Sequence, residues 1–209
     1  MTVEPVEFVF IDLGNVLINF SYDIGASRLS EMTGRTADEI LQFVFQGPLQ
    51  ADYESGRITT DQFAGKFNHH FQTKIDHQEI ASAASDIFWP NAQMIPLVAG
   101  LYSSGMSLGI LSNTCPAHWD FVSRGRYRFV NDFFPKRVLS FKVGFMKPAP
   151  QIYAFAAKLA GVAPHRILFF DDRVENVTAA NAFGFQAHLF RSAIETAKLL
   201  RQSGCELNY

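Results

Sequence analysis

The sequence of 209 residues is poor in the features that mark secreted, membrane-bound or nucleic-acid-binding proteins. It has only two cysteines, Cys115 and Cys205, which do not indicate a disulfide framework, so a reducing compartment is the simpler interpretation. No uninterrupted apolar stretch approaches the ~18 residues of a membrane helix. The first residues lack the basic start and apolar stretch of a secretory signal. We therefore expect a cytoplasmic protein that does not bind membranes.

Charge of either sign is not in excess, since 18 basic side chains face 20 acidic ones and the net charge is -2. No block of lysine and arginine stands out that could follow a phosphate backbone, so nucleic acid is not an expected partner. A chain of this length buries roughly 70% of its unfolded surface, enough for one good core and a smaller second lobe. The sequence does not indicate an oligomeric state.

Short apolar runs alternate with helical patterns along most of the chain. The runs are brief and end in Gly, Asp or Asn, as buried parallel strands do. Gly161 and Gly184 stand where two helical patterns end. The alternation predicts an α/β fold with a doubly wound parallel sheet of five to six strands. Strands are expected at about 6–11, 107–111, 137–140, 166–170 and 186–189, and helices at 92–104, 116–123, 150–160 and 173–183.

Nearly a hundred residues separate the first two predicted strands, far more than a crossover connection needs. Residues 20–88 look helical throughout, so we expect a helical cap inserted into a core formed by residues 1–19 and 89–209. Two capping boxes support this prediction, because each places a hydroxyl three residues before Glu or Gln and satisfies free amide groups. They are Thr36-Ala37-Asp38-Glu39 and Thr59-Thr60-Asp61-Gln62, and they predict helix starts near residues 37 and 60.

Three apolar runs end on polar or ionisable residues. The run 8–11 stops at Asp12, a second run stops at Ser112, and a third stops at Asp171-Asp172. An ionisable group at the end of an apolar strand is costly unless it is paired or metal-bound. The carboxyl ends of parallel strands line one crevice, so these side chains and Lys147 are expected to converge there.

Such a site needs cations. Three carboxylates within ~4 Å of one another repel by about 4 kcal/mol per pair at an effective dielectric near 20. Lys147 supplies one positive charge and a Mg²⁺ ion two, which together cancel the charges of Asp12, Asp171 and Asp172. The sequence therefore predicts a Mg²⁺ site that is able to accept a phosphoryl group.

These motifs, in this order and with a helical insertion after the first, resemble the haloacid dehalogenase superfamily of aspartyl-nucleophile phosphohydrolases. The resemblance covers nearly the whole chain and implies the Rossmann-like core of that superfamily. Within it, the chain is similar to the helical-cap branch that contains glucose-1-phosphate phosphatase-like enzymes and the N-terminal phosphatase domain of bifunctional epoxide hydrolases. The motifs are the Asp12 loop, Leu111-Ser112-Asn113-Thr114, residues 144–153, and residues 169–177 with Ala179, Ala180 and Gly184.

The resemblance implies a Mg²⁺-dependent phosphatase that hydrolyses a small phosphate monoester, such as a sugar phosphate, through an aspartyl-phosphate. Asp12 would attack phosphorus, and Lys147 would hold this nucleophile and neutralise charge on the transferring group. The resemblance also implies that Ser112, Asn113 and Lys147 bind the phosphate. Asp12, Asp172 and the Gly14 carbonyl would bind Mg²⁺, and Asp171 would contact a metal-bound water. Asn176 would orient the acidic loop.

Each of these residues also has a structural interpretation. Asp12 fits a turn, Ser112 and Asn113 fit a turn or helix cap, and Asp172 fits the N-cap of the following helix. Lys147 by itself would be a solvated loop lysine. The structural interpretation is favoured for any one of them alone, and the functional interpretation is favoured for the combination.

One position departs from the family pattern. In most phosphatases of the superfamily the residue two after the nucleophile is a second Asp, which protonates the leaving group, and here it is Gly14. Such an acid typically contributes about 10² to 10⁴ in rate. We hypothesise a substrate whose leaving group needs little protonation, such as an anomeric sugar phosphate, an aryl phosphate or an acyl phosphate.

Glycine at position 14 is also compatible with a replacement acid or with a different function class. His118 is the candidate for a replacement acid, with a packed helix histidine beside Trp119 as the structural alternative. His69, His70 and Arg57 are weaker candidates. The different function class would be a non-catalytic module that binds a phosphometabolite or, with less support, a haloacid dehalogenase. Asp171-Asp172 speaks for Mg²⁺ and phosphate and against the dehalogenase.

Overall fold

The computed structural model describes residues 5–207, and its centre is a parallel sheet of five strands in the order β5-β4-β1-β6-β7. Val9 of the central strand lies opposite Leu108 on one side and Leu168 on the other. The predicted α/β class with a parallel sheet is confirmed, and all five predicted strands are present at the expected places. They are β1 (Phe8–Ile11), β4 (Ser107–Ser112), β5 (Lys136–Leu139), β6 (Ile167–Asp171) and β7 (Gln186–Leu189).

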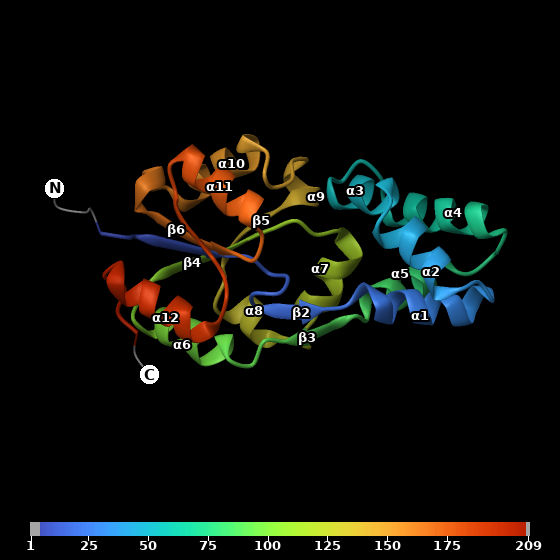
Figure 1. The fold of residues 1–209 in the computed structure, drawn as a ribbon, viewed down its shortest axis with the longest axis horizontal. Coiled ribbons are helices and arrows are strands. Elements are labelled where there is room, and N and C mark those ends of the chain that lie inside the picture. The colour runs from blue at the N-terminus through green and yellow to red at the C-terminus, as the bar shows by residue number, and fades with distance from the viewer. Residues whose placement is uncertain (1–4, 208–209) are drawn as a thin grey trace.

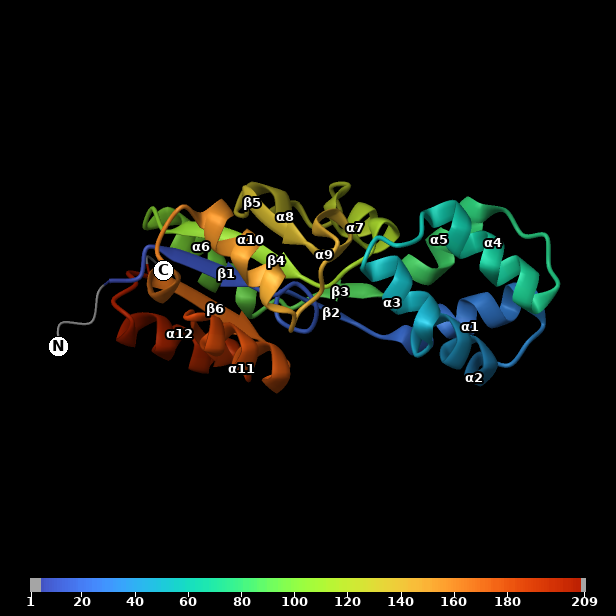
Figure 2. The ribbon, with the colours of Figure 1, turned by 90° about the horizontal axis from the view of Figure 1, so that it is seen from above.

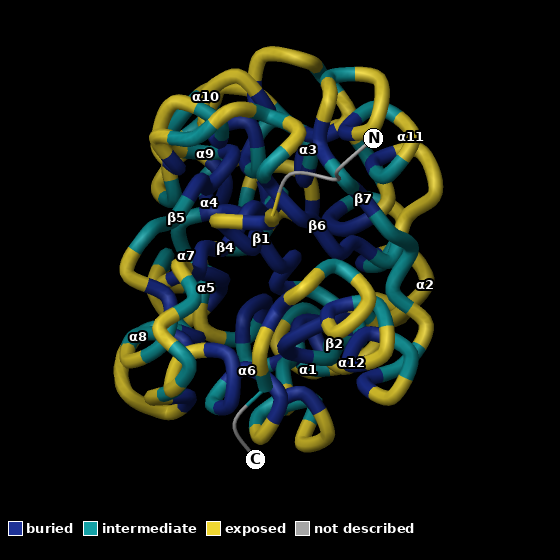
Figure 3. Tube along the Cα trace, turned by 90° about the vertical axis from the view of Figure 1, so that its left-hand side faces the viewer, coloured by how far each residue is buried: buried dark blue, intermediate teal, exposed yellow. Residues whose placement is uncertain are grey.

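Helices cover both faces of the sheet, as the doubly wound topology requires (Figure 1). Successive side chains of a strand point to opposite faces. Accordingly, Phe8 and Phe10 pack in one apolar cluster with α10 and α11, and Val9 and Ile11 pack in a second with α6 and α12. Figure 3 shows the strands buried in the middle of the molecule. These helices are α6 (Met94–Ser103), α10 (Pro150–Ala160), α11 (Val174–Phe183) and α12 (Ala193–Gln202).

Three more helices and a 3₁₀ turn complete the part of the chain around the sheet. They are α7 (Pro116–Ser123), α8 (Arg128–Asp132), α9 (Ser140–Val143) and the turn η2 (Pro164–Arg166). The four helices predicted outside the insertion correspond to α6, α7, α10 and α11. Helices α8, α9 and α12 were not predicted from the sequence, and in α8 and α9 five and four residues are too few to show a helical period.

The long connection between β1 and β4 folds into a separate group of helices, here called the helical insertion (residues 22–85). Figures 1 and 2 show it beyond one end of the sheet. It has its own apolar core, in which Leu29, Val44, Phe63, Phe67 and Ile80 are buried. Its elements are α1 (Tyr22–Thr33), α2 (Ala37–Ile40), the π-helical turn η1 (Leu41–Phe45), α3 (Pro48–Glu54), α4 (Thr60–Phe71) and α5 (His77–Ser85).

Both predicted capping boxes are confirmed. The Glu39 N–H donates to the Thr36 hydroxyl at 3.3 Å, and the Thr36 N–H donates to the Glu39 carboxylate at 2.9 Å. Thr59 and Gln62 make the same pair of bonds at 3.2 and 2.9 Å. These bonds satisfy amide groups that the first turns of α2 and α4 leave without helical partners.

A short antiparallel ribbon joins the helical insertion to the rest of the chain. β2 (Ile18–Phe20) pairs with β3 (Phe88–Pro90), and Phe20 lies opposite Phe88. The predicted helical segment 20–88 therefore begins and ends with strand residues. Runs of three residues carry no periodicity that would have shown this.

The turn after α3 docks the helical insertion on α9. Gly56 has a φ of +72°, and a Cβ atom there would lie 2.4 Å from the Phe141 carbonyl oxygen. The Ser140 hydroxyl donates to the Glu54 carbonyl oxygen at 2.6 Å, and the Ala117 N–H donates to the Tyr53 hydroxyl at 3.2 Å. The backbone of this turn therefore lies directly against the core. Within residues 5–207, no helix combines the length and apolar character needed to cross a membrane.

We predict that Gly56→Ala destabilises the protein more than Gly105→Ala. Both residues have positive φ, +72° and +81°, so each alanine costs about 1–2 kcal/mol for the left-handed backbone. Only at Gly56 does the new methyl group meet backbone, which adds about 1–3 kcal/mol. Urea unfolding of both variants measures the difference, and equal losses of unfolding free energy would show that the contact with Phe141 is unimportant.

Candidate active site

The centre of the site is the ammonium group of Lys147, which is 4% exposed. Its Nζ lies 2.8 Å from Asp12 Oδ1 and 2.6 Å from Asp171 Oδ2, and it donates to the Leu111 carbonyl oxygen at 2.9 Å. Asp12 follows β1, Asp171 ends β6 and Leu111 belongs to β4, so three neighbouring strands supply the partners. The predicted convergence of Asp12, Lys147 and Asp171 is present in the structure.

Asp171 is fully buried, and both of its carboxylate oxygens engage protein donors. Asn176 Nδ2 lies 2.9 and 3.1 Å from the two oxygens, and the Arg173 N–H donates to Oδ1 at 2.9 Å. Asn176 thus makes the contact with the acidic loop that its predicted role requires. Asp171 is thus held in a fixed orientation beside Lys147.

Asp172 lies at the edge of the site, where its Oδ2 accepts a hydrogen bond from Asn15 Nδ2 at 3.1 Å. Ligand oxygens of Asp12, Asp171 and Asp172 all lie within 4.8 Å of one another. Asn15 was not predicted as a site residue, although its place directly after Gly14 and its φ of +54° fit a residue type that tolerates the left-handed region. Asn15 connects the loop after β1 with the loop after β6.

The electrostatics of the cluster show that one ammonium does not balance three carboxylates. Burial raises the pKa of Asp12 to about 7, although Lys147 opposes the rise. Burial also raises the pKa of Asp172, and the hydrogen bond from Asn15 opposes it. Burial lowers the pKa of Lys147, but Asp12 and Asp171 outweigh this effect and raise it overall, so the lysine stays charged. A divalent cation would remove the remaining imbalance.

Ser112 and Asn113 lie at the end of β4, close to Lys147. The Asn113 side chain binds the backbone of Lys147 twice, because its Nδ2 donates to the Lys147 carbonyl oxygen at 2.9 Å and its Oδ1 accepts from the Lys147 N–H at 2.8 Å. The Asn113 amide therefore holds the lysine loop in place. The Ser112 hydroxyl makes one weaker bond, to the Asn113 carbonyl oxygen at 3.3 Å, and is freer to meet a phosphoryl oxygen.

The aromatic ring of Phe20 occupies the space beside Gly14. A Cβ atom on Gly14 would lie 2.9 Å from Phe20 Cε1, too close for any larger side chain unless the ring moves. The ring in turn packs against Tyr22, with centroids 4.9 Å apart, and against Phe88 at 5.9 Å. The space beside Gly14 is filled by an apolar group, so no acid can extend from this position in the observed arrangement.

His118 lies in α7, 5% exposed, and its surroundings fit a packed histidine. Its ring is edge-on to Phe88 at 5.2 Å, and its Nε2 lies 3.3 Å from the Ala84 carbonyl oxygen. Burial lowers its pKa from 6.5 to about 4. A histidine that is neutral at physiological pH and faces a backbone carbonyl is a poor proton donor, so these contacts favour the structural interpretation.

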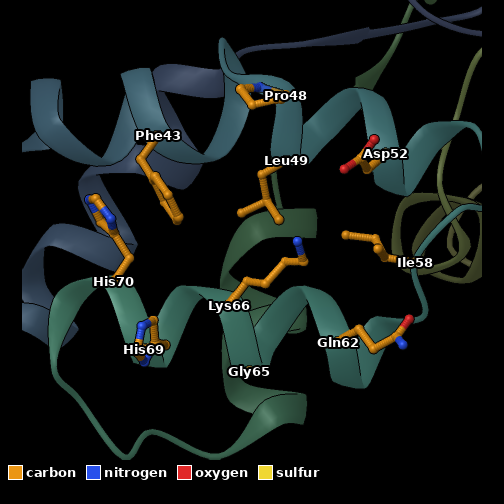
Figure 4. Close-up of a pocket in the computed structure, with 10 residues that line it drawn as sticks. All are labelled: Phe43, Pro48, Leu49, Asp52, Ile58, Gln62, Gly65, Lys66, His69 and His70. Carbon is orange, nitrogen blue, oxygen red and sulfur yellow. The ribbon is translucent and has the colours of Figure 1, made fainter.

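The weaker candidates for a replacement acid lie on the helical insertion, outside this cluster. His69 and His70 line a groove of about 560 Å³ between α3 and α4, where Lys66 extends across the opening (Figure 4). His70 stacks on Phe43 with ring centroids 3.7 Å apart. Arg57 pairs with Asp52 at 2.8 Å. None of the residues that line the groove belongs to the acidic cluster.

Comparison with known proteins agrees with this geometry. The model of the haloacid dehalogenase-like hydrolase family matches residues 7–184. Among curated proteins, the D-ribitol-5-phosphate phosphatase of Bacteroides thetaiotaomicron is 26% identical over 185 residues, which cover 85% of this chain and 88% of the relative.

Solved structures show the same fold. A HAD family enzyme of Bacteroides thetaiotaomicron superposes with a TM-score of 0.82 at 22% identity, over 95% of this chain and all of that one. The same enzyme has been solved in complex with magnesium and inorganic phosphate, with a TM-score of 0.78 at 24% identity over 89% and 94% of the chains. A HAD-like family hydrolase of Porphyromonas gingivalis gives 0.79 at 25% identity over 95% and 99%.

His118 should make the protein sensitive to acid. Its folded pKa of about 4 lies below the ordinary 6.5, so its contribution to stability is present above pH 6.5 and is lost as pH falls toward 4. The shift corresponds to about 3 kcal/mol. Unfolding free energies measured from pH 7 to pH 4 should fall less steeply in His118→Gln than in the wild type. The exposed His69→Gln is the control, and parallel curves for all three proteins would contradict the prediction.

Gly14 and Phe20 should be energetically coupled. Gly14→Ala places a methyl group against the Phe20 ring, at a cost of about 1–3 kcal/mol. Phe20→Leu removes the contacting ring atom, so the same alanine should cost at least about 0.5 kcal/mol less in that background. A double-mutant cycle from urea unfolding gives this coupling. Additive effects would mean that the ring does not restrict position 14.

Proposed function

Since the chain belongs to the haloacid dehalogenase-like hydrolase family, we propose that it is a Mg²⁺-dependent phosphatase that hydrolyses a small phosphate monoester through an aspartyl-phosphate at Asp12. Family membership confirms the resemblance drawn from the four sequence motifs. The named relative is a phosphatase of a sugar alcohol phosphate, which supports a substrate of this size and chemistry.

The observation that carries the proposal is the pairing of Asp12 with the buried Lys147 ammonium at 2.8 Å. This contact orients one oxygen of Asp12 and leaves the other to approach phosphorus as the nucleophile. Attack forms a covalent aspartyl-phosphate and splits one displacement into two steps. The positive charge of Lys147 compensates charge on the transferring group, and the Ser112 hydroxyl is placed to bind a phosphoryl oxygen.

The acidic cluster fits Mg²⁺. Carboxylate oxygens of Asp12, Asp171 and Asp172 lie within 4.8 Å of one another, and hard oxygen ligands are those that Mg²⁺ prefers. We assign Asp12, Asp172 and the Gly14 carbonyl oxygen as protein ligands, with Asp171 contacting a bound water. When bound, the ion polarises the phosphoryl oxygens and shields the nucleophile from their charge. The complex of the Bacteroides enzyme with magnesium and phosphate supports magnesium as the cofactor.

The helical insertion serves in this proposal as a cap over the site, with residues 20–88 as the cap and residues 1–19 and 89–209 as the core. It packs against the core through the turn after α3, and contacts between α5 and α7 extend this interface. A cap in this place excludes water and contacts the leaving group of the substrate.

Glycine at position 14 is compatible with two ways for the alcohol to leave. Either the leaving group departs with little protonation, as hypothesised from the sequence, or an acid comes from another part of the chain. Sensitivity of the rate to the leaving-group pKa separates the two, because an enzyme without an acid depends steeply on that pKa.

The nucleophile is tested with Asp12→Asn. The wild type should hydrolyse p-nitrophenyl phosphate and members of a sugar phosphate panel only with Mg²⁺, and the variant should show only background turnover, because an amide does not form the phosphoenzyme. Asp38→Asn, at an exposed position of α2, is the control and should keep wild-type activity. A phosphate-binding module without catalysis would instead be stabilised by phosphate esters in thermal unfolding and would turn over none of them.

A further inference from the structure

The helix that ends at the turn docking the helical insertion carries a partly buried carboxyl group, that of Glu54. Glu54 is the last residue of α3 and is half-buried. Its Oε1 accepts hydrogen bonds from Gln50 Nε2 at 2.8 Å and from the Tyr22 hydroxyl at 3.5 Å. These three residues, Tyr22, Gln50 and Glu54, form the Glu54 cluster. Its members come from α1 and α3, so the cluster belongs to the insertion and not to the core.

Hydrogen bonds to the core fix the backbone of Glu54. The Ser140 hydroxyl donates to the Glu54 carbonyl oxygen at 2.6 Å and accepts from the Thr114 N–H at 2.9 Å. Thr114 comes two residues after Ser112, which ends β4 at the site. A single hydroxyl therefore ties Glu54 to the loop that carries the proposed phosphate-binding serine.

The charges of the site reach the Glu54 side chain. Burial raises the pKa of Glu54, and its hydrogen bonds with Gln50 and Tyr22 oppose the rise. The positive charges of Arg173 and Lys147 lower the pKa as well, so this carboxyl lies within electrostatic range of the ammonium that holds the nucleophile. The net effect favours a protonated carboxyl more than an ordinary glutamate does.

Two further titratable groups face Glu54, Tyr22 on α1 and Cys115 before α7. Burial is the main cause that raises the pKa of each, and the Glu54 charge adds to it. Both groups are therefore neutral in the physiological range. Lys147 and Arg173 bring positive charge near Glu54.

On the core side, the usual place for an acid is blocked. The Phe20 ring fills the space beside Gly14, and the same ring packs against Tyr22 of the Glu54 cluster at 4.9 Å. The apolar ring that closes position 14 and the Glu54 cluster are thus adjacent through Tyr22.

We propose that Glu54 is the general acid and base of the reaction, in the role that residue 14 cannot fill; the inference rests on the proposed function. As a bond forms between Asp12 and phosphorus and the bond from phosphorus to the leaving oxygen breaks, the Glu54 carboxyl gives its proton to that oxygen. The resulting carboxylate then takes a proton from the water that attacks the aspartyl-phosphate. This second displacement releases phosphate and restores both carboxyl groups.

The test compares leaving groups in the Mg²⁺-loaded enzyme. In Glu54→Gln, kcat/KM for an alkyl phosphate such as glycerol 3-phosphate should fall by about 10² to 10⁴, the usual contribution of a general acid. p-Nitrophenyl phosphate, whose leaving group needs little protonation, should lose less than about tenfold. Glu31→Gln, which removes an exposed carboxyl from α1 of the same insertion, should match the wild type with both substrates.

A second variant tests the same role through the pH dependence of activity. Activity should decline at alkaline pH as Glu54 loses its proton, and this alkaline limb should be absent from Glu54→Gln. The hydrogen bond from Gln50 lowers the pKa of Glu54, so Gln50→Met should move the alkaline limb of kcat/KM to higher pH. This readout needs no change of Glu54 itself and holds even where Glu54→Gln does not fold.

The outcomes separate this assignment from the proposed function. Equal losses in Glu54→Gln for alkyl and aryl phosphates, or a change confined to KM, overturn the assignment and leave the phosphatase intact. An unmoved alkaline limb in Gln50→Met does the same. A wild type that turns over no phosphate ester, like Asp12→Asn, overturns the phosphatase and the assignment together.

Discussion

The structure depends on one buried contact, the Lys147 ammonium between Asp12 and Asp171. An ammonium and two carboxylates taken out of water are stable only when they satisfy one another. Three adjacent parallel strands supply the groups that contact the ammonium. The Asn113 amide holds the Lys147 backbone, because it donates to the Lys147 carbonyl oxygen and accepts from the Lys147 N–H. The register of the sheet, the loop after β4 and the loop that carries Lys147 must therefore all be correct for this contact to form.

The same loop after β4 connects this contact to the helical insertion. Ser140 links Thr114 with the carbonyl oxygen of Glu54, and Gly56 lets the next residues lie against Phe141. A few hydrogen bonds and one close backbone approach thus hold the insertion against the core beside the proposed phosphate site.

Much of the fold and part of the site could be predicted from local sequence. Short apolar runs indicated the five strands, and the Thr36 and Thr59 capping boxes indicated two helix starts, because strands, caps and turns are determined by neighbouring residues. Asp12 and Asp171 were also predictable, since each follows or ends such a run, and Lys147 was predicted from the motif of residues 144–153. Side-chain partners were not: whether the amide of Asn113 faces substrate or the Lys147 backbone depends on packing between distant segments.

Glu54 shows why a proton donor on the insertion is not predicted from sequence. It carries no motif in one sequence and belongs to the insertion, whose placement over the sheet depends on tertiary contacts with Ser140 and Phe141. His118 was the easier candidate because its ordinary pKa suits proton transfer, yet burial lowers that pKa to about 4, while burial raises that of Glu54. Burial disfavours the charged form in both cases, and so removes a proton donor from one residue and creates one at the other. A carboxylic acid is thus the better donor where burial disfavours charge, and the docked insertion supplies one while Phe20 leaves residue 14 no room.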